Sequence, residues 1–129
     1  MTAIVDTSAL FALLDGDDTH HVEAVRRWDR ALEVELVTHS YVIVESLTLV
    51  RASLGRDAVV ALADRVLPGI RVEMVDRDVH DAALREYRGM GGGTSFVDGV
   101  TIAYAARNAI DTAFAFDRDL ETAGLNSLV

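Results

Sequence analysis

Apolar and polar residues follow one another in blocks along this chain, and the blocks predict strands and helices in alternation. Ala3–Val5 is a short apolar run, which is typical of a buried parallel strand. Leu36–Val37 predicts a second strand, and Ala113–Phe116, apolar throughout, predicts a central one. Between these last two strands, residues 70–74 alternate between apolar and polar, with the apolar side chains at Ile70, Val72 and Met74. This alternation predicts an edge strand with one solvated face.

Helical spacing of apolar residues fills the segments between these strands. The predicted helices begin near Thr7, Thr19 and Ser40 and span Arg56–Leu67, Asp78–Arg88 and Ser95–Asn108. We expect Ser40 to be an N-cap, and Val79, Ala83 and Tyr87 to face inward. Strands that alternate with helices favour a parallel sheet with helices on both faces. The prediction is one three-layer α/β domain over residues 1–129 with four strands, and a short fifth strand at Leu125–Val129.

Composition limits the class of protein. The chain has 129 residues, half of them apolar, which fits one globular domain. No apolar run approaches the ~20 residues of a membrane span, and no basic leader precedes the first apolar run. The absence of cysteine excludes disulfides and thiolate metal sites. We therefore expect a cytoplasmic protein that does not bind membranes.

The charge balance excludes further classes. A net charge of −9 argues against broad electrostatic capture of nucleic acid, although a cluster of metal-binding carboxylates would supply part of that charge. All 12 basic residues are arginine. The missing lysine excludes a Walker-type phosphate loop and a Schiff-base enzyme.

Four carboxylates are predicted to lie at the same edge of the sheet. Asp6 follows the first strand, and Asp117 follows the last apolar strand. Asp98 belongs to the first turn of the helix before that strand, and Glu45 to the helix after the second strand. Ligands of parallel sheets bind beyond the carboxyl ends of the strands. If the first strand is central, with the second and fourth beside it, the four acids converge.

Each acid also has a purely structural interpretation. Asp6 and Asp117 could cap helices, and Asp98 could complete a capping box with Ser95. Glu45 could lie on a solvated helix face. Asp119 is best interpreted as part of a capped turn. Four independent caps, however, have no reason to gather at one sheet edge.

Gathered carboxylates repel one another unless a cation or a proton compensates. Oxygen ligands without histidine or cysteine suit Mg²⁺, or Mn²⁺ as an alternative. Such ions neutralise phosphate oxygens and activate attacking water. The pattern therefore indicates a phosphodiesterase or a phosphatase.

At these residues the chain resembles a family. The stretches Ile4–Leu10, Val44–Ser46, Ser95–Asp98 and Phe116–Leu120, followed by Ala123–Leu125, resemble the PIN domains, in particular the VapC toxins. The resemblance covers nearly the whole chain. It implies a parallel sheet of four or five strands and a Mg²⁺-dependent endoribonuclease, the toxin of a type II toxin–antitoxin system. It also implies a homodimer and a neutralising VapB-like antitoxin.

Position by position, the resemblance implies a site. Its acidic ligands and catalytic residues would be Asp6, Glu45, Asp98 and Asp117. Polar supports near the metal would be Thr7, Ser8 and Ser95. The RNA target and the number of metal ions stay open.

Other interpretations remain. A haloacid-dehalogenase-like phosphatase would need an aspartate where Ser8 stands and normally a lysine, and a receiver domain fails for the same lysine. A metal-dependent phosphohydrolase of a small substrate and a catalytically silent PIN-like protein-binding domain stay open. The glycine-rich segment Gly89–Gly93 is interpreted as a connection or an active-site loop, and His39 and His80 as surface residues.

Overall fold

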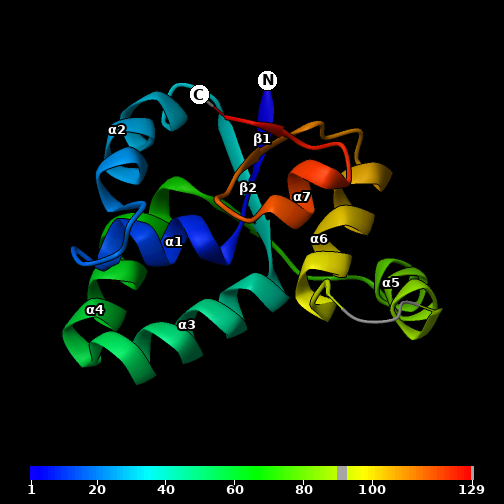
Figure 1. The fold of residues 1–129 in the computed structure, drawn as a ribbon, viewed down its shortest axis with the longest axis horizontal. Helices are drawn as coiled ribbons and strands as arrows, with labels where there is room; N and C mark the ends of the chain where they lie inside the picture. Colours follow the sequence, from blue (N-terminus) through cyan, green and yellow to red (C-terminus); the bar gives the residue numbers. More distant parts are fainter. Residues whose placement is uncertain (90–92, 129) are drawn as a thin grey trace.

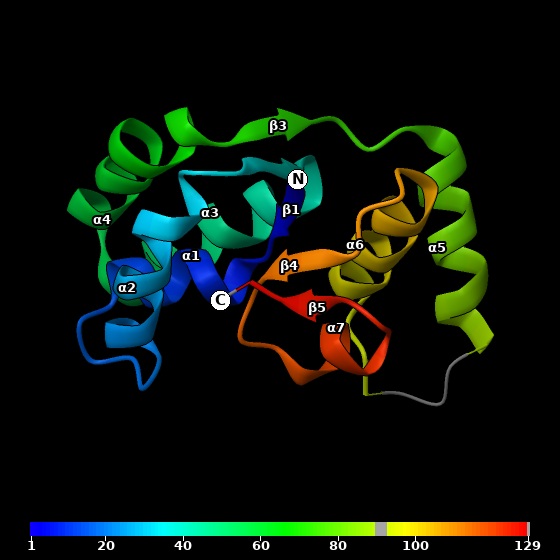
Figure 2. The same cartoon turned by 90° about the horizontal axis from the view of Figure 1, so that it is seen from above.

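A computed structural model describes residues 1–89 and 93–128. At its centre lies a five-stranded sheet in the order β3-β2-β1-β4-β5, in which every neighbouring pair is parallel (Figure 1 and Figure 2). The strands are β1 (Thr2–Val5), β2 (Glu35–His39), β3 (Arg71–Glu73), β4 (Thr112–Phe114) and β5 (Asn126–Ser127). The predicted parallel sheet is confirmed, with the first strand between the second and fourth and with a fifth strand in the tail.

Helices cover both faces of this sheet. They are α1 (Thr7–Leu14), α2 (His21–Ala31), α3 (Ser40–Leu54), α4 (Arg56–Ala61), α5 (Arg77–Gly89), α6 (Phe96–Arg107) and α7 (Arg118–Thr122). After α4 the chain continues as a π-helical segment, Leu62–Val66, and a 3-10 turn, Leu67–Gly69. Figure 2 shows α1 to α4 on one side of the sheet and α5 to α7 on the other. The predicted three-layer α/β architecture is confirmed.

Alternation along β1 divides the core into two clusters. Ala3 and Val5 pack with residues of α1, α3 and the π-helical segment, whereas Ile4 packs with residues of α5, α6 and α7. Phe114 and Ala113 of β4 divide in the same way. Burial of both faces explains why Ala3–Val5 and Ala113–Phe114 are apolar at consecutive positions.

Two details of the predicted core are wrong. β3 is an edge strand as expected, but Val72 is exposed and Met74, just after the strand, is 78% exposed. The strand pairs over only three positions with β2, so the alternating pattern extends beyond the residues that the core covers. Tyr87 is also exposed, although Val79 and Ala83 are buried as predicted. It lies near the end of α5 with its ring against Phe96.

Two helix starts differ from the prediction. The helix expected near Thr19 begins at His21. His39, and not Ser40, is the N-cap of α3, because its ring nitrogen Nδ1 accepts the Val42 N–H. The Ser40 hydroxyl instead accepts the Val75 N–H and ties the segment after β3 to the start of α3.

Part of the glycine-rich segment, Met90 to Gly92, lies outside the described residues, so its expected role as a connection or active-site loop stays a prediction. Val129 of the predicted last strand also lies outside them. Within residues 1–89 and 93–128, no helix combines the length and hydropathy that crossing a bilayer requires.

Candidate metal centre

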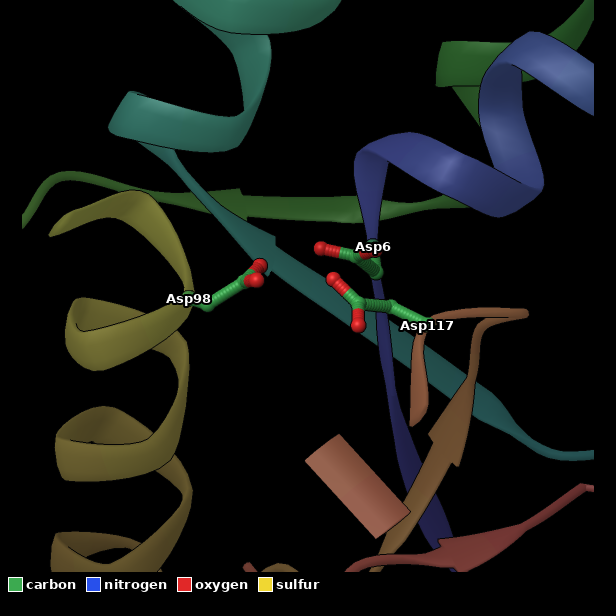
Figure 3. A group of neighbouring side chains, drawn as sticks. All are labelled: Asp6, Asp98 and Asp117. Atoms are coloured by element: carbon green, nitrogen blue, oxygen red, sulfur yellow. The ribbon is translucent and has the colours of Figure 1, made fainter. Parts of the chain in front are cut away.

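Three aspartates meet beyond the carboxyl ends of β1 and β4. Asp6 follows β1 directly, Asp117 lies three residues after β4, and Asp98 projects from the first turn of α6. One carboxylate oxygen from each lies within 4.8 Å of the other two. Figure 3 shows the three side chains pointing toward one another from these three segments. The parallel sheet produces this convergence, because both strands end at the same edge.

Asp6 has one satisfied and one unsatisfied oxygen. Its Oδ2 accepts hydrogen bonds from the Ser8 backbone N–H at 3.2 Å and the Ser8 hydroxyl at 2.7 Å, which caps α1. Its Oδ1 is the one buried side-chain polar atom without a hydrogen-bond partner in the part of the chain that the structure describes. The side chain is only 2% exposed. Such an oxygen is costly to bury unless something else binds it.

Burial dominates the electrostatics of Asp6. Desolvation raises the pKa of its carboxyl, the hydrogen bonds from Ser8 lower that pKa, and the charge of Asp117 raises it further. The helix cap therefore lowers the pKa of this carboxyl, whereas the neighbouring charge of the cluster raises it. The capping interpretation of Asp6 is correct, but it accounts for only one of the two oxygens.

The pKa of Asp98 is also strongly raised. Its side chain is 7% exposed, and desolvation raises its pKa to about 8. A hydrogen bond to Asp117 is the second cause, and the charges of Asp6, Asp117 and Glu45 follow. A carboxyl with so strongly raised a pKa, among other carboxylates, marks a candidate functional site where a proton or a cation compensates the charge.

Only half of the predicted capping box forms in α6. The Ser95 hydroxyl accepts the Asp98 N–H at 3.1 Å and caps the helix. The return bond, from the Ser95 N–H to the Asp98 carboxylate, is absent from the hydrogen bonds of the described residues. The carboxylate turns toward Asp6 and Asp117 instead (Figure 3).

Asp117 and Glu45 differ in how closely they join the cluster. Asp117 caps α7 through a bond from the Asp119 N–H to its Oδ1 at 2.9 Å, and its carboxylate also reaches the cluster. Glu45, half-buried on α3, is not one of the three acids within 4.8 Å of one another. Its charge still raises the pKa of Asp98, so Glu45 lies near the cluster without being part of it.

Two of the predicted polar supports, Ser8 and Thr7, make hydrogen bonds beside the cluster. Ser8 links two segments, because its hydroxyl donates to Asp6 and accepts the Phe116 N–H at 2.9 Å. That bond fixes the loop that carries Asp117 against the start of α1. Thr7 is buried and accepts a hydrogen bond from Ser46, the neighbour of Glu45, at 3.3 Å.

A buried histidine next to the site was missed by the sequence analysis. His39 is fully buried, so the prediction of a surface residue is wrong. Its Nδ1 accepts the Val42 N–H, so Nε2 donates to the Thr101 hydroxyl at 2.7 Å, which donates to the Val97 carbonyl. Burial lowers the pKa of His39 to about 4, so the ring is neutral. This chain of bonds connects β2 to the first turns of α6, one turn from Asp98.

The donor set fits a hard divalent cation. All its atoms are oxygens, which is the ligand type that Mg²⁺ prefers, and one of them has no hydrogen-bond partner among the described residues. One oxygen from each aspartate lies within 4.8 Å of the other two. The charges repel one another unless a cation enters. The described residues therefore suit a hard divalent cation such as Mg²⁺ or Mn²⁺ in their donor chemistry.

The profile of the PIN domain family matches residues 3–125 of this chain. The chain belongs to the PIN-domain family. This PIN domain is 36% identical to the 23S rRNA-specific endonuclease VapC20 of Mycobacterium tuberculosis, over 93% of this chain and 92% of that protein. The predicted resemblance to the VapC toxins is confirmed.

Solved structures agree with this assignment. The crystal structure of M. tuberculosis VapC20, described as a sarcin–ricin loop cleaving toxin, matches with a TM-score of 0.87 and 31% identity, over 97% of this chain and 96% of that one. FitAcB from Neisseria gonorrhoeae matches with a TM-score of 0.71 and 17% identity, covering 100% of this chain and 97% of the other. At that identity, the second likeness shows the PIN fold alone.

Proposed function

We propose that this PIN-domain protein is a Mg²⁺-dependent endoribonuclease, the toxin of a type II toxin–antitoxin pair, and that it cleaves the sarcin–ricin loop of 23S rRNA. The observation that carries the proposal is the buried three-aspartate cluster with the orphaned Oδ1 of Asp6. The similarity to VapC20 over nearly the full length of both chains supports the substrate. Cleavage of ribosomal RNA would stop translation and growth.

Under this proposal the residues divide the work. Asp6, Asp98 and Asp117 hold the ion, and Glu45 adds charge at the side of the cluster. Ser8 orients Asp6, Ser95 fixes the turn that carries Asp98, and Thr7 joins α1 to α3. A bound Mg²⁺ or Mn²⁺ ion would neutralise the scissile phosphate and promote water attack. Mn²⁺ would serve as a substitute ion.

The first test is the chemistry of cleavage. Incubation with a sarcin–ricin hairpin is expected to give cleavage only with Mg²⁺ or Mn²⁺, because the acidic site cannot approach a phosphate without a cation. Water attack should leave a 3′-hydroxyl and a 5′-phosphate, which end-labelling and mass spectrometry distinguish. Full activity in chelator, or a 2′,3′-cyclic phosphate product, would contradict the proposal.

We also propose two protein partners, a second copy of the chain and a cognate VapB-like antitoxin. Among the described residues, large apolar side chains stay exposed on four helices: Val22, Val25, Val44, Leu49, Val60, Leu84 and Tyr87. We infer that some of these residues belong to contiguous apolar patches, the kind of surface by which proteins bind partners.

Light scattering should therefore give a dimer mass at micromolar concentration, because association removes part of this apolar surface from water. Addition of the protein encoded by the adjacent gene should give a larger complex without ribonuclease activity. A monomer at that concentration would contradict the homodimer, and a toxin that stays active in the mixture would contradict the antitoxin.

A further inference from the structure

A second feature adjoins the acidic cluster and is not used by it. A pocket of about 200 Å³ lies between α2, the loop from β4 to α7, and β5. Its polar lining includes Arg27, Asp117, Arg118, Glu121 and Ser127. Asp117 belongs to both the pocket and the cluster, so the two sites adjoin at this residue. A strand bound at the aspartates would therefore pass close to this pocket.

Arg27 is held in a fixed position at the pocket. Its guanidinium carbon lies over the Phe116 ring, 5.3 Å from the ring centroid. Its Nε donates to Glu23 at 2.7 Å, and its Nη1 donates to the Ser127 hydroxyl at 3.0 Å. The side chain is 16% exposed. Since these contacts already order the guanidinium, little conformational entropy remains to be lost when a ligand binds.

The same contacts fix Arg27 relative to the acidic cluster. Phe116 immediately precedes Asp117, and its backbone N–H donates to the Ser8 hydroxyl, which donates to Asp6. On the Phe116 ring, His20 stacks with the ring centroids 4.6 Å apart. Arg27 is therefore connected to the aspartates by its contact with the Phe116 ring and by the hydrogen bonds from Phe116 to Ser8 and from Ser8 to Asp6.

Arg118 supplies a second guanidinium. It follows Asp117 directly and is exposed, and it takes part in none of the salt bridges of residues 1–89 and 93–128. In a chain with a net charge of −9, two arginines beside a carboxylate cluster are a local exception. The pocket also contains the carboxylates of Glu121 and Asp117, whose negative charges offset those of the two arginines. The positive charge is therefore confined to the two guanidinium groups and does not form a broad basic surface.

We infer that this pocket is a subsite for a backbone phosphate of the RNA, neighbouring the scissile one, with Arg27 and Arg118 as its ligands. The guanidinium geometry matches phosphate oxygens, and contacts of this type position the chain without reading its sequence. The inference rests on the proposed ribonuclease function and extends it. It explains how an acidic protein places an RNA strand across its carboxylates.

The test is the affinity for RNA and its salt dependence, measured in an Asp98→Asn background so that the RNA stays intact. The probes are oligouridylate and the sarcin–ricin hairpin. Arg118→Gln and Arg27→Gln should each weaken binding about tenfold, because each removes a charge-assisted hydrogen bond. Each should also reduce the slope of log K against log salt by about 0.7 on the single strand.

Two variants serve as controls. Arg26→Gln changes the net charge equally on the same helix, and Arg26 pairs with the same Glu23 but does not line the pocket. It should leave the affinity and the salt slope unchanged. Glu121→Gln removes a negative charge from the pocket and should tighten binding. Arg118→Gln breaks no salt bridge of the described residues, so its melting temperature should equal that of the parent.

The outcomes separate the two proposals. If the wild type cleaves RNA but both arginine variants bind both probes as Arg26→Gln does, the subsite is wrong and the ribonuclease stands. If the two arginine variants keep their affinity for RNA and lose affinity for the antitoxin, the pocket is a protein-binding surface and the inference is overturned. If the wild type does not cleave the hairpin but the variants lose oligouridylate affinity, the subsite stands and the proposed target is wrong.

Discussion

Replacing Asp98 with asparagine is expected to reduce RNA cleavage at least ~100-fold at saturating Mg²⁺, because the change removes a ligand charge from the centre of the cluster while keeping its size. Asp6→Asn and Asp117→Asn should cause losses of the same order, since one oxygen from each lies within 4.8 Å of the others. Glu45→Gln should lose less, roughly 10-fold, because Glu45 lies beside the three and not among them. Initial rates on the sarcin–ricin hairpin measure each effect.

Asp119→Asn is the matched control for this series. Asp119 is two residues from Asp117 and carries the same charge, but among the described residues its carboxylate makes no hydrogen bond or salt bridge, and only its backbone contacts Asp117. Its activity should stay within about twofold of the wild type, and its circular dichroism should be unchanged. If Asp119→Asn loses as much activity as Asp98→Asn, the assignment of Asp119 to a capped turn is wrong. If Asp98→Asn keeps more than a tenth of the activity, the metal centre is misassigned.

The convergence of Asp6 and Asp117 could be predicted from two local signals and one general rule, once the first strand was assumed to lie beside the last apolar strand. Asp6 and Asp117 follow apolar strands, and parallel strands end at the same edge of the sheet. Asp98 was predictable from the start of its helix. The structural interpretations of these acids were not wholly wrong, since Asp6 and Asp117 do cap helices. Each carboxylate has two oxygens, and a cap can use one while the other faces the cluster.

The features that sequence could not supply depend on partners far along the chain. The buried ring of His39 is satisfied because the Thr101 hydroxyl, 62 residues later, accepts a hydrogen bond from its Nε2, and no pattern around position 39 carries that information. Arg27 is ordered by Phe116 and Ser127, which are equally remote. Val72 and Met74 show the opposite error, since both were predicted to be covered and both are exposed. Periodicity predicts which side chains share a face, but not whether another element covers that face.

In metal-free protein, Asp98→Asn is expected to raise the melting temperature. The folded-state pKa of Asp98 is raised to about 8, whereas an aspartate in an unfolded chain titrates near 3.9. Between these values the native state binds more protons than the unfolded state. The stability that this proton contributes is therefore complete below about pH 4 and is lost as the pH rises through about 8. Asparagine does not ionise, so the stability of the variant does not fall in this way as the pH rises.

The size of the effect depends on pH in a way that a structural role would not reproduce. The advantage of Asp98→Asn should be largest near pH 9 and shrink toward pH 5, changing by at most ~1.4 kcal/mol per pH unit within that window. Melting curves in chelator at pH 5, 7 and 9 measure it, at roughly 4 °C per kcal/mol for a domain of this size. Asp119→Asn, whose side chain makes no such contacts, should show no comparable trend.

Addition of Mg²⁺ should reverse the order of the two proteins. The ion binds the native wild type and stabilises it by mass action, whereas the variant lacks one ligand charge and gains less. If Asp98 only completed a capping box, asparagine would be neutral or cost up to ~1 kcal/mol at every pH, and Mg²⁺ would not distinguish the proteins. A variant that melts lower than the wild type in chelator at pH 7 and 9, with no Mg²⁺ shift in either protein, would eliminate the metal centre. The orphaned Oδ1 of Asp6 and the inward turn of the Asp98 carboxylate favour the opposite result, because both place negative charge where only a cation or a proton can compensate it.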